Sequence, residues 1–89
     1  MIERDVRILN EEGLHARPAA RIVRLSALYQ SEIEIVKDGL AVNGKSIMGV
    51  MMLSAECGST ITFRASGADE ALAVDALCDL AAQRFGDSK

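Results

Sequence analysis

The apolar residues of this chain follow two different spacings, and segments with one spacing alternate with segments with the other. Apolar side chains at every second position indicate a strand with one buried face, whereas a spacing of three and four indicates a helix. Alternation covers residues 2–9, 32–37, 40–42 and 60–65, and helical spacing covers residues 16–28, a short segment after Ser46 and a segment beginning at Asp69. The order β-α-β-β-α-β-α predicts an α+β domain, with helices on one face of a mainly antiparallel sheet.

The same patterns predict which side chains are buried. The inward-facing residues are expected to be Ile33, Ile35, Ile61, Phe63 and Ala65 in the strands, Ala19, Ile22, Val23, Ser26 and Ala27 in the first helix, and Ala73, Val74, Leu77, Leu80 and Ala81 in the last. Asp38 and Gly39 separate two alternating segments, which predicts a hairpin with a type I′ turn, because both of its central residues need a positive φ.

Composition limits the classes of protein to which the chain can belong. Its 89 residues suffice for one domain, and 49% apolar but only 3% aromatic residues predict an aliphatic core. No apolar run approaches the ~20 residues that span a membrane, and the charged N-terminal residues contain no signal segment. The two cysteines, Cys57 and Cys78, give no disulfide framework, which is typical of a reducing compartment. We expect a soluble, cytoplasmic monomer without membrane insertion.

The charge distribution argues against binding to nucleic acid. The formal net charge is −3, and there is no aromatic platform on which bases would stack. Three arginines, Arg17, Arg21 and Arg24, nevertheless have spacings of four and three, which places them along one face of the first helix. This face is either a solvated surface or a docking surface for an acidic protein partner.

The only histidine, His15, is predicted to lie where a loop becomes the first helix. Pro18 supports this placement, because proline is tolerated in the first helical turn, where backbone N–H groups have no intrahelical partner. His15 is then at or next to the N-cap, beside the free amides of Ala16 and Arg17. The positive end of the helix and the Arg17 guanidinium disfavour the imidazolium, so the ring is expected to be neutral and nucleophilic. The same groups would stabilise a phosphoryl group accepted by the ring.

Other roles for His15 are open on these residues alone. A lone histidine near a helix start is commonly a cap or a surface residue. A metal site is disfavoured, because there is no second histidine and the cysteines are far away. A hydrolase with His15 as general base would need a nucleophile and an orienting carboxylate, and only Glu11 and Glu12 lie close in the sequence.

The segment Gly-Leu-His-Ala-Arg-Pro-Ala-Ala, residues 13–20, resembles the active-site signature of HPr, the histidine-containing phosphocarrier of the bacterial phosphotransferase system. The resemblance implies an open-faced sandwich with strand order 1-4-2-3 and three helices on one face. It implies that His15 accepts a phosphoryl group at Nδ1 from enzyme I and passes it to A-type components of enzyme II. Ala16 and Arg17 would bind the phosphoryl oxygens. The chain would need no metal or cofactor of its own.

The second informative segment is residues 45–53, Lys-Ser-Ile-Met-Gly-Val-Met-Met-Leu. Ser46 is a candidate N-cap, because its hydroxyl can accept from the amides of the next turn. Six of the seven residues after it are apolar, more than one buried helix face can hold. Val50 and Leu53 are assigned to the core. Ile47, Met48 and Met51 are expected to form an exposed patch that adapts to several partners.

This segment is similar to HPr proteins whose serine is phosphorylated by an ATP-dependent HPr kinase/phosphorylase. The likeness implies that Ser46 is a regulatory phosphosite, where the added charge would disturb the docking of an acidic partner. It leaves an alternative open: a mainly regulatory HPr-like protein, in a nitrogen-type branch or in carbon control, that acts through protein binding.

Overall fold

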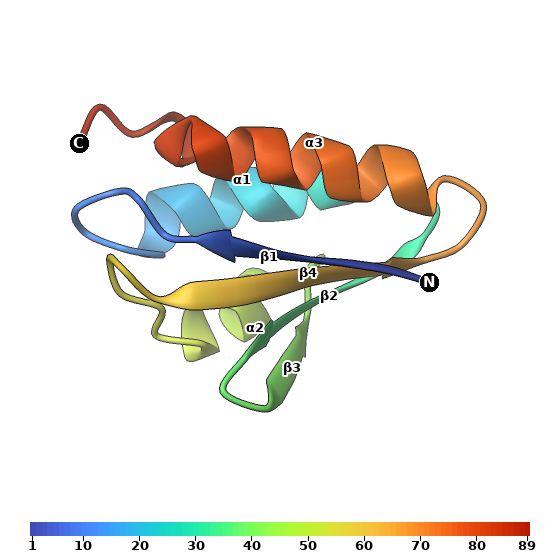
Figure 1. Ribbon diagram of the computed structural model, residues 1–89, viewed down its shortest axis with the longest axis horizontal. Helices are drawn as coiled ribbons and strands as arrows, with labels where there is room; N and C mark the ends of the chain where they lie inside the picture. Colours follow the sequence, from blue (N-terminus) through green and yellow to red (C-terminus); the bar gives the residue numbers. More distant parts are fainter.

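The molecule has two layers, a four-stranded sheet and the helices packed along it (Figure 1). The computed structural model describes residues 1–89. Its elements are β1 (Ile2–Arg7), α1 (Ala16–Ser26), β2 (Glu32–Lys37), β3 (Leu40–Asn43), α2 (Ile47–Met52), β4 (Thr60–Ser66), α3 (Glu70–Ala82) and the 3₁₀ turn η1 (Arg84–Gly86). This confirms the predicted order of strands and helices. No helix combines the length and apolar character that crossing a membrane requires.

The strands lie side by side in the order β1-β4-β2-β3, and every neighbouring pair is antiparallel. This is the order that the resemblance implied. Asp38 and Gly39 join β2 to β3 with φ angles of 50° and 82°, as the predicted type I′ turn requires. Phe63 in β4 is paired with Ile35 in β2, and both side chains are fully buried. The inner strands therefore supply the centre of the core.

The core lies between the sheet and the helices. All five strand residues predicted to face inward are buried, and so are Ala19, Ile22, Ser26, Ala73, Val74, Leu77 and Ala81 from the long helices. Val23 and Leu80 are partly buried against this core. α1 ends at Ser26, two residues before the predicted Leu28, because the N–H groups of Leu28 and Tyr29 bond to carbonyls only three residues back. Ala27 therefore follows the helix and is exposed.

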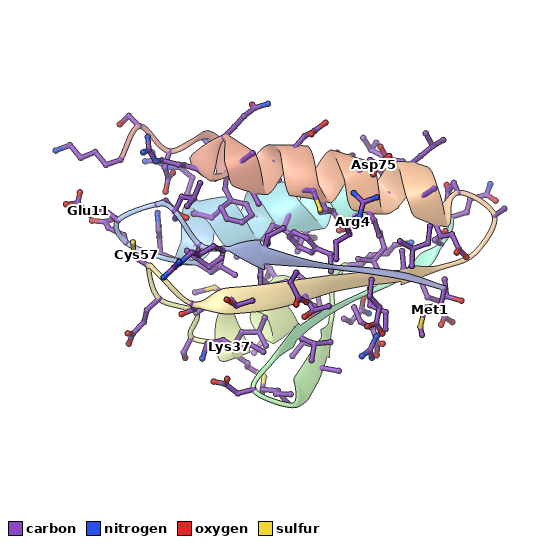
Figure 2. All side chains as sticks on the ribbon, viewed as in Figure 1. Met1, Arg4, Glu11, Lys37, Cys57 and Asp75 are labelled. Carbon is purple, nitrogen blue, oxygen red and sulfur yellow. The ribbon has the colours of Figure 1, made fainter.

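The sheet face without helices is polar. Arg64 in β4 lies 2.8 Å from Glu3 of β1 and 3.2 Å from Glu34 of β2, so one guanidinium links three neighbouring strands. On the helix side, Figure 2 shows Arg4 of β1 extending toward Asp75 of α3, with which it forms an ion pair of 3.1 Å. These surface pairs each contribute little to stability.

After α3 the chain makes a tight turn at η1 and then folds back along the molecule. Arg84 and Phe85 both adopt left-handed backbone conformations, with φ of 56° and 54°, and the Phe85 side chain is fully buried. The last residues then run back toward the loop between β1 and α1, and the backbone N–H of Glu11 donates to Lys89 O at 3.0 Å. Figure 1 shows the C-terminus at the same end of the molecule as this loop.

Candidate functional site

The loop between β1 and α1 is held in one conformation by its own hydrogen bonds and by a neighbouring segment. The N–H of Leu14 donates to the carbonyl of Ala55 at 2.9 Å, and the buried side-chain amide of Asn10 donates to the carbonyl of Gly13. Gly13 has a φ of 66°, and a Cβ at this position would overlap the carbonyl oxygen of Ala55. The loop therefore requires glycine here, and it places the next polar residue, His15, at a defined point.

His15 is the N-cap residue of α1, as predicted. Its backbone is extended, with φ −78° and ψ −170°, and its carbonyl accepts the Ala19 N–H at 3.1 Å. Pro18 lies in the first turn and has no N–H to offer. The His15 side chain forms no capping hydrogen bond, and no acidic residue lies in the first turn. The amides of Ala16 and Arg17, at the positive end of the helix, thus receive no cap from the His15 side chain or from a first-turn carboxylate.

The His15 ring lies at a shallow polar pocket of about 190 Å³. No apolar residue lines it; the lining residues are Glu11, Glu12, His15, Arg17, Asp87, Ser88 and Lys89. The His15 side chain is 34% exposed, so a partner protein can reach it. Arg17 is exposed, and none of the ion pairs of the chain involves its guanidinium. The pocket therefore combines a reachable imidazole with an uncommitted cation.

A carboxylate that the sequence analysis missed lies against the imidazole. Nε2 of His15 is 3.0 Å from Oδ2 of Asp87 and 3.7 Å from Oε2 of Glu12. The prediction of a neutral ring was made from the positive neighbours alone, and it stays a prediction. The one signal that pointed to the tail was Phe85, an apolar residue in an otherwise polar segment.

The other candidate residues lie outside this pocket. Ser46 is the N-cap of α2, where its Oγ accepts from the Gly49 N–H at 3.2 Å. Ile47, Met48 and Met51 are exposed, as predicted, and so is Met52; we call these four residues the apolar patch. Val50 and Leu53 are buried in the core, which confirms their assignment.

The three arginines of α1 differ in their surroundings. Arg24 is exposed. Arg21, in contrast, donates to the carbonyl of Phe85 at 2.6 Å and lies 3.4 Å from Oδ1 of Asp87. The two cysteines lie outside the pocket, and burial raises the pKa of the Cys78 thiol, so its thiolate is disfavoured. No three His, Cys, Asp or Glu side chains are grouped so that they could hold a metal ion.

A family model described as "PTS HPr component phosphorylation site" matches residues 2–83 of the sequence. That range contains both the loop that carries His15 and the whole sheet. The chain belongs to the HPr family. Members of this family are phosphocarriers of the phosphotransferase system, which agrees with a reachable histidine in a polar pocket rather than a cleft lined for a substrate.

Individual relatives agree with this assignment. The phosphocarrier protein HPr of Cupriavidus necator is 46% identical, and the match covers 100% of both chains. A crystal structure of HPr from Thermoanaerobacter tengcongensis is 43% identical, covers 100% of both chains and has a TM-score of 0.95. A structure of an HPr dimer from the same organism is 44% identical, covers 98% of this chain and 100% of its own, and has a TM-score of 0.78.

Proposed function

We propose that this protein accepts a phosphoryl group on His15 from phosphorylated enzyme I and passes it to A-type components of enzyme II. The observation that carries the proposal is the α1 N-terminus, where the ring does not cap its own helix and the first-turn amides have no intrahelical partner. A side chain that is half-exposed at such a point is available to a partner protein.

Each group at this terminus has a role in the transfer. The imidazole acts as the nucleophile and carries the phosphoryl group between partners. The backbone amides of Ala16 and Arg17 donate to its oxygens at the positive end of α1. The guanidinium of Arg17, which lines the same pocket, adds a full charge and a fork of donors that match a phosphate.

The test mixes the protein with enzyme I and phosphoenolpyruvate and measures acid-labile phosphate on the chain. Wild type should take up one phosphate, and His15→Ala should take up none, because His15 is the only histidine. Ser46→Ala is the matched control and should be labelled like wild type. Uptake of the same phosphate by His15→Ala would refute the assignment of the acceptor.

We propose that the apolar patch, together with Arg21 and Arg24, docks the partner proteins. α1 and α2 are in contact, which brings the exposed methionines and the arginine face onto neighbouring helices. Met48 is 74% exposed, and flexible thioether side chains suit several different partners. Arg24→Glu should slow transfer and reduce its salt dependence. Equal rates for this variant and wild type at low ionic strength would make the arginine face a merely solvated surface.

Ser46 is proposed as a regulatory phosphosite for an HPr kinase/phosphorylase that uses ATP. Support comes from its position, because the hydroxyl is half-buried at the start of α2, directly before the apolar patch. A phosphate there would place about two negative charges beside the surface on which partners dock. Ser46→Ala should lose ATP-dependent labelling while it keeps labelling from enzyme I. Labelling of Ser46→Ala by the kinase would move the site elsewhere.

We propose that the protein transfers the phosphoryl group as a cytoplasmic monomer, since the same pocket must meet several partners in turn. Sedimentation at micromolar concentration tests the oligomeric state, which is of interest because a dimer of a related HPr is known. The alternative, a mainly regulatory protein, predicts that His15→Ala leaves the physiological output unchanged while Ser46→Ala abolishes it.

A further inference from the structure

The C-terminal tail brings the carboxylate of Asp87 to one nitrogen of the His15 ring. The distance from Nε2 to Oδ2 is 3.0 Å, and the Asp87 side chain is only 12% exposed. An ionised carboxylate has no proton to donate, so Nε2 must carry the proton of this hydrogen bond. In the neutral ring the lone pair that can attack is then on Nδ1.

Two further donors hold the Asp87 carboxylate in place. Arg21 lies 3.4 Å from Oδ1 and also donates to the carbonyl of Phe85 at 2.6 Å. The buried side-chain amide of Asn10 lies 3.4 Å from Oδ2 and also donates to Gly13 in the loop before α1. The carboxylate is therefore tied both to α1 and to the loop that positions His15.

The backbone just before Asp87 is strained, and its turn brings the Asp87 carboxylate to the ring. Arg84 and Phe85 have positive φ values, which are unfavourable for residues other than glycine. Full burial of the Phe85 ring offsets this cost. Gly86 follows with φ 82°, and a Cβ there would lie 2.7 Å from Nη1 of Arg21. The turn is thus anchored in the core and leaves room for the arginine that holds Asp87.

We propose that Asp87 is a positioning residue that keeps the ring proton of His15 on Nε2 and so makes Nδ1 the phosphoryl acceptor. The inference rests on the proposed function of His15. The family model matches residues 2–83, so Asp87 lies outside the residues that it matches.

The chemistry of the transfer gives Asp87 a second effect. The Nδ1 lone pair forms a bond to phosphorus, and the bond from phosphorus to its donor atom on enzyme I breaks, with the electron pair staying on that atom. The Nε2 proton is retained, so the ring becomes a positively charged N-phosphoryl imidazolium. A carboxylate at Nε2 stabilises this charge as it develops, in the manner of the aspartate of a catalytic triad. It does so at the nitrogen that the phosphoryl group does not use.

The direct test is nitrogen NMR of the neutral imidazole, which is unambiguous because the chain contains one histidine. The wild-type ring should carry its proton on Nε2. In Asp87→Ala the fraction protonated on Nδ1 should rise about tenfold, which corresponds to the loss of one charge-assisted hydrogen bond. Asp87→Asn keeps an acceptor oxygen and should lie between the two. Ser88→Ala, in the same tail, is the matched control. Tautomer populations in Asp87→Ala equal to those of wild type would overturn the proposal.

The rate of phosphoryl uptake from enzyme I gives the second readout. Asp87→Ala should lower kcat about tenfold and leave the KM for enzyme I within about twofold, because the variant changes the nucleophile rather than the docking surface. Circular dichroism and the melting temperature verify the fold of each variant. An unchanged kcat with wild-type phosphorylation at His15 refutes the positioning role alone. Absence of phosphate on wild-type His15 refutes the proposed function, whatever the tautomer.

Substitution of Arg21 distinguishes a positioning role of this residue from a docking role. If it acts through Asp87, Arg21→Met should shift the tautomer populations in the wild-type background and have no further effect in Asp87→Ala. A docking role predicts instead an increase in KM that is the same in both backgrounds. Equal tautomer shifts in both backgrounds would show that Arg21 does not act through the carboxylate.

Discussion

The N-termini of α1 and α2 are completed in different ways, although both follow a residue in extended backbone conformation. At α2, the Ser46 hydroxyl accepts from the Gly49 N–H, so the side chain closes the helix on itself. At α1, His15 gives no side-chain cap, and Pro18 removes one of the donors that a cap would satisfy. One terminus is therefore closed and the other is open.

The difference shows how a small domain separates stability from function. The closed terminus belongs to a helix of six residues, which gains from every satisfied amide. The open terminus belongs to an 11-residue helix whose buried stripe already holds it against the core, so it can leave its first amides for a ligand. Side-chain substitutions at the two helix termini should consequently affect different measurements, activity for the residues at α1 and stability for the cap at α2.

The largest effect is expected from Arg17→Ala at the open terminus. Loss of one charged donor to the transferred phosphoryl group should lower the rate of uptake roughly 100-fold. The melting temperature should not change, because Arg17 takes part in no ion pair of the chain. Arg17→Lys keeps the charge without the fork of donors and should recover only part of the rate. A full rate in Arg17→Ala would remove this residue from the site.

Gly13→Ala should damage the same terminus through its backbone. The left-handed φ and the overlap of a Cβ with the Ala55 carbonyl should cost at least about 2 kcal/mol of unfolding free energy. Urea denaturation measures this cost. Gly39→Ala is the matched control, since it also has a positive φ but meets no atom within 4 Å, and it should cost less. Equal losses would show that the conformation, and not the close approach to Ala55, is what requires glycine.

Ser46→Ala tests the role of the cap at the N-terminus of α2. Loss of the cap should lower the unfolding free energy by about 1 kcal/mol, measured by denaturant titration, with phosphoryl uptake at His15 unchanged. Ser46→Asp should restore the cap and thus the stability, while its charge weakens partner docking. If Ser46→Ala slows uptake as much as it destabilises the fold, the two termini are not independent.

The smallest effect on stability is expected at the N-terminus of α3. Asp69 precedes this helix, but its carboxylate accepts instead from the Ser31 hydroxyl and from the backbone N–H groups of Gln30 and Ser31. The Ser31 hydroxyl contributes most to holding the pKa of Asp69 below its ordinary value, and the Gln30 amide adds to this. Because the folded-state pKa is lowered, the stabilisation is present above the unfolded-state pKa and is lost as the pH falls through the folded one.

Denaturant titrations at decreasing pH test this dependence. Asp69→Asn should be less stable than wild type at neutral pH, and the difference should shrink in acid. The Glu70 carboxylate, whose pKa is lowered chiefly by the Gly67 N–H, titrates in the same direction and remains in both proteins. A difference that is constant with pH would show that the Asp69 charge does not contribute.

Local patterns in the sequence predicted most of the fold. Alternation placed Ile33, Ile35 and Phe63 in the core, because the side chains of a strand alternate between its two faces whatever surrounds it. The end of α1 was placed two residues too late, since nothing local distinguishes the last helical turn from the tighter turn that follows. Met52 was missed because an apolar residue next to a buried helix face can point either way.

The histidine end of the molecule divides most clearly into what the sequence determined and what it did not. The start of α1 after His15 could be predicted, because a glycine, a proline and a helical stripe within ten residues act through local backbone geometry alone. The contact of the ring with Asp87, 72 positions away, could not be predicted from any local pattern. That contact depends on the burial of Phe85 and on a turn through left-handed conformations. The free energy of such a turn comes from the packed core, and no spacing along the chain records it.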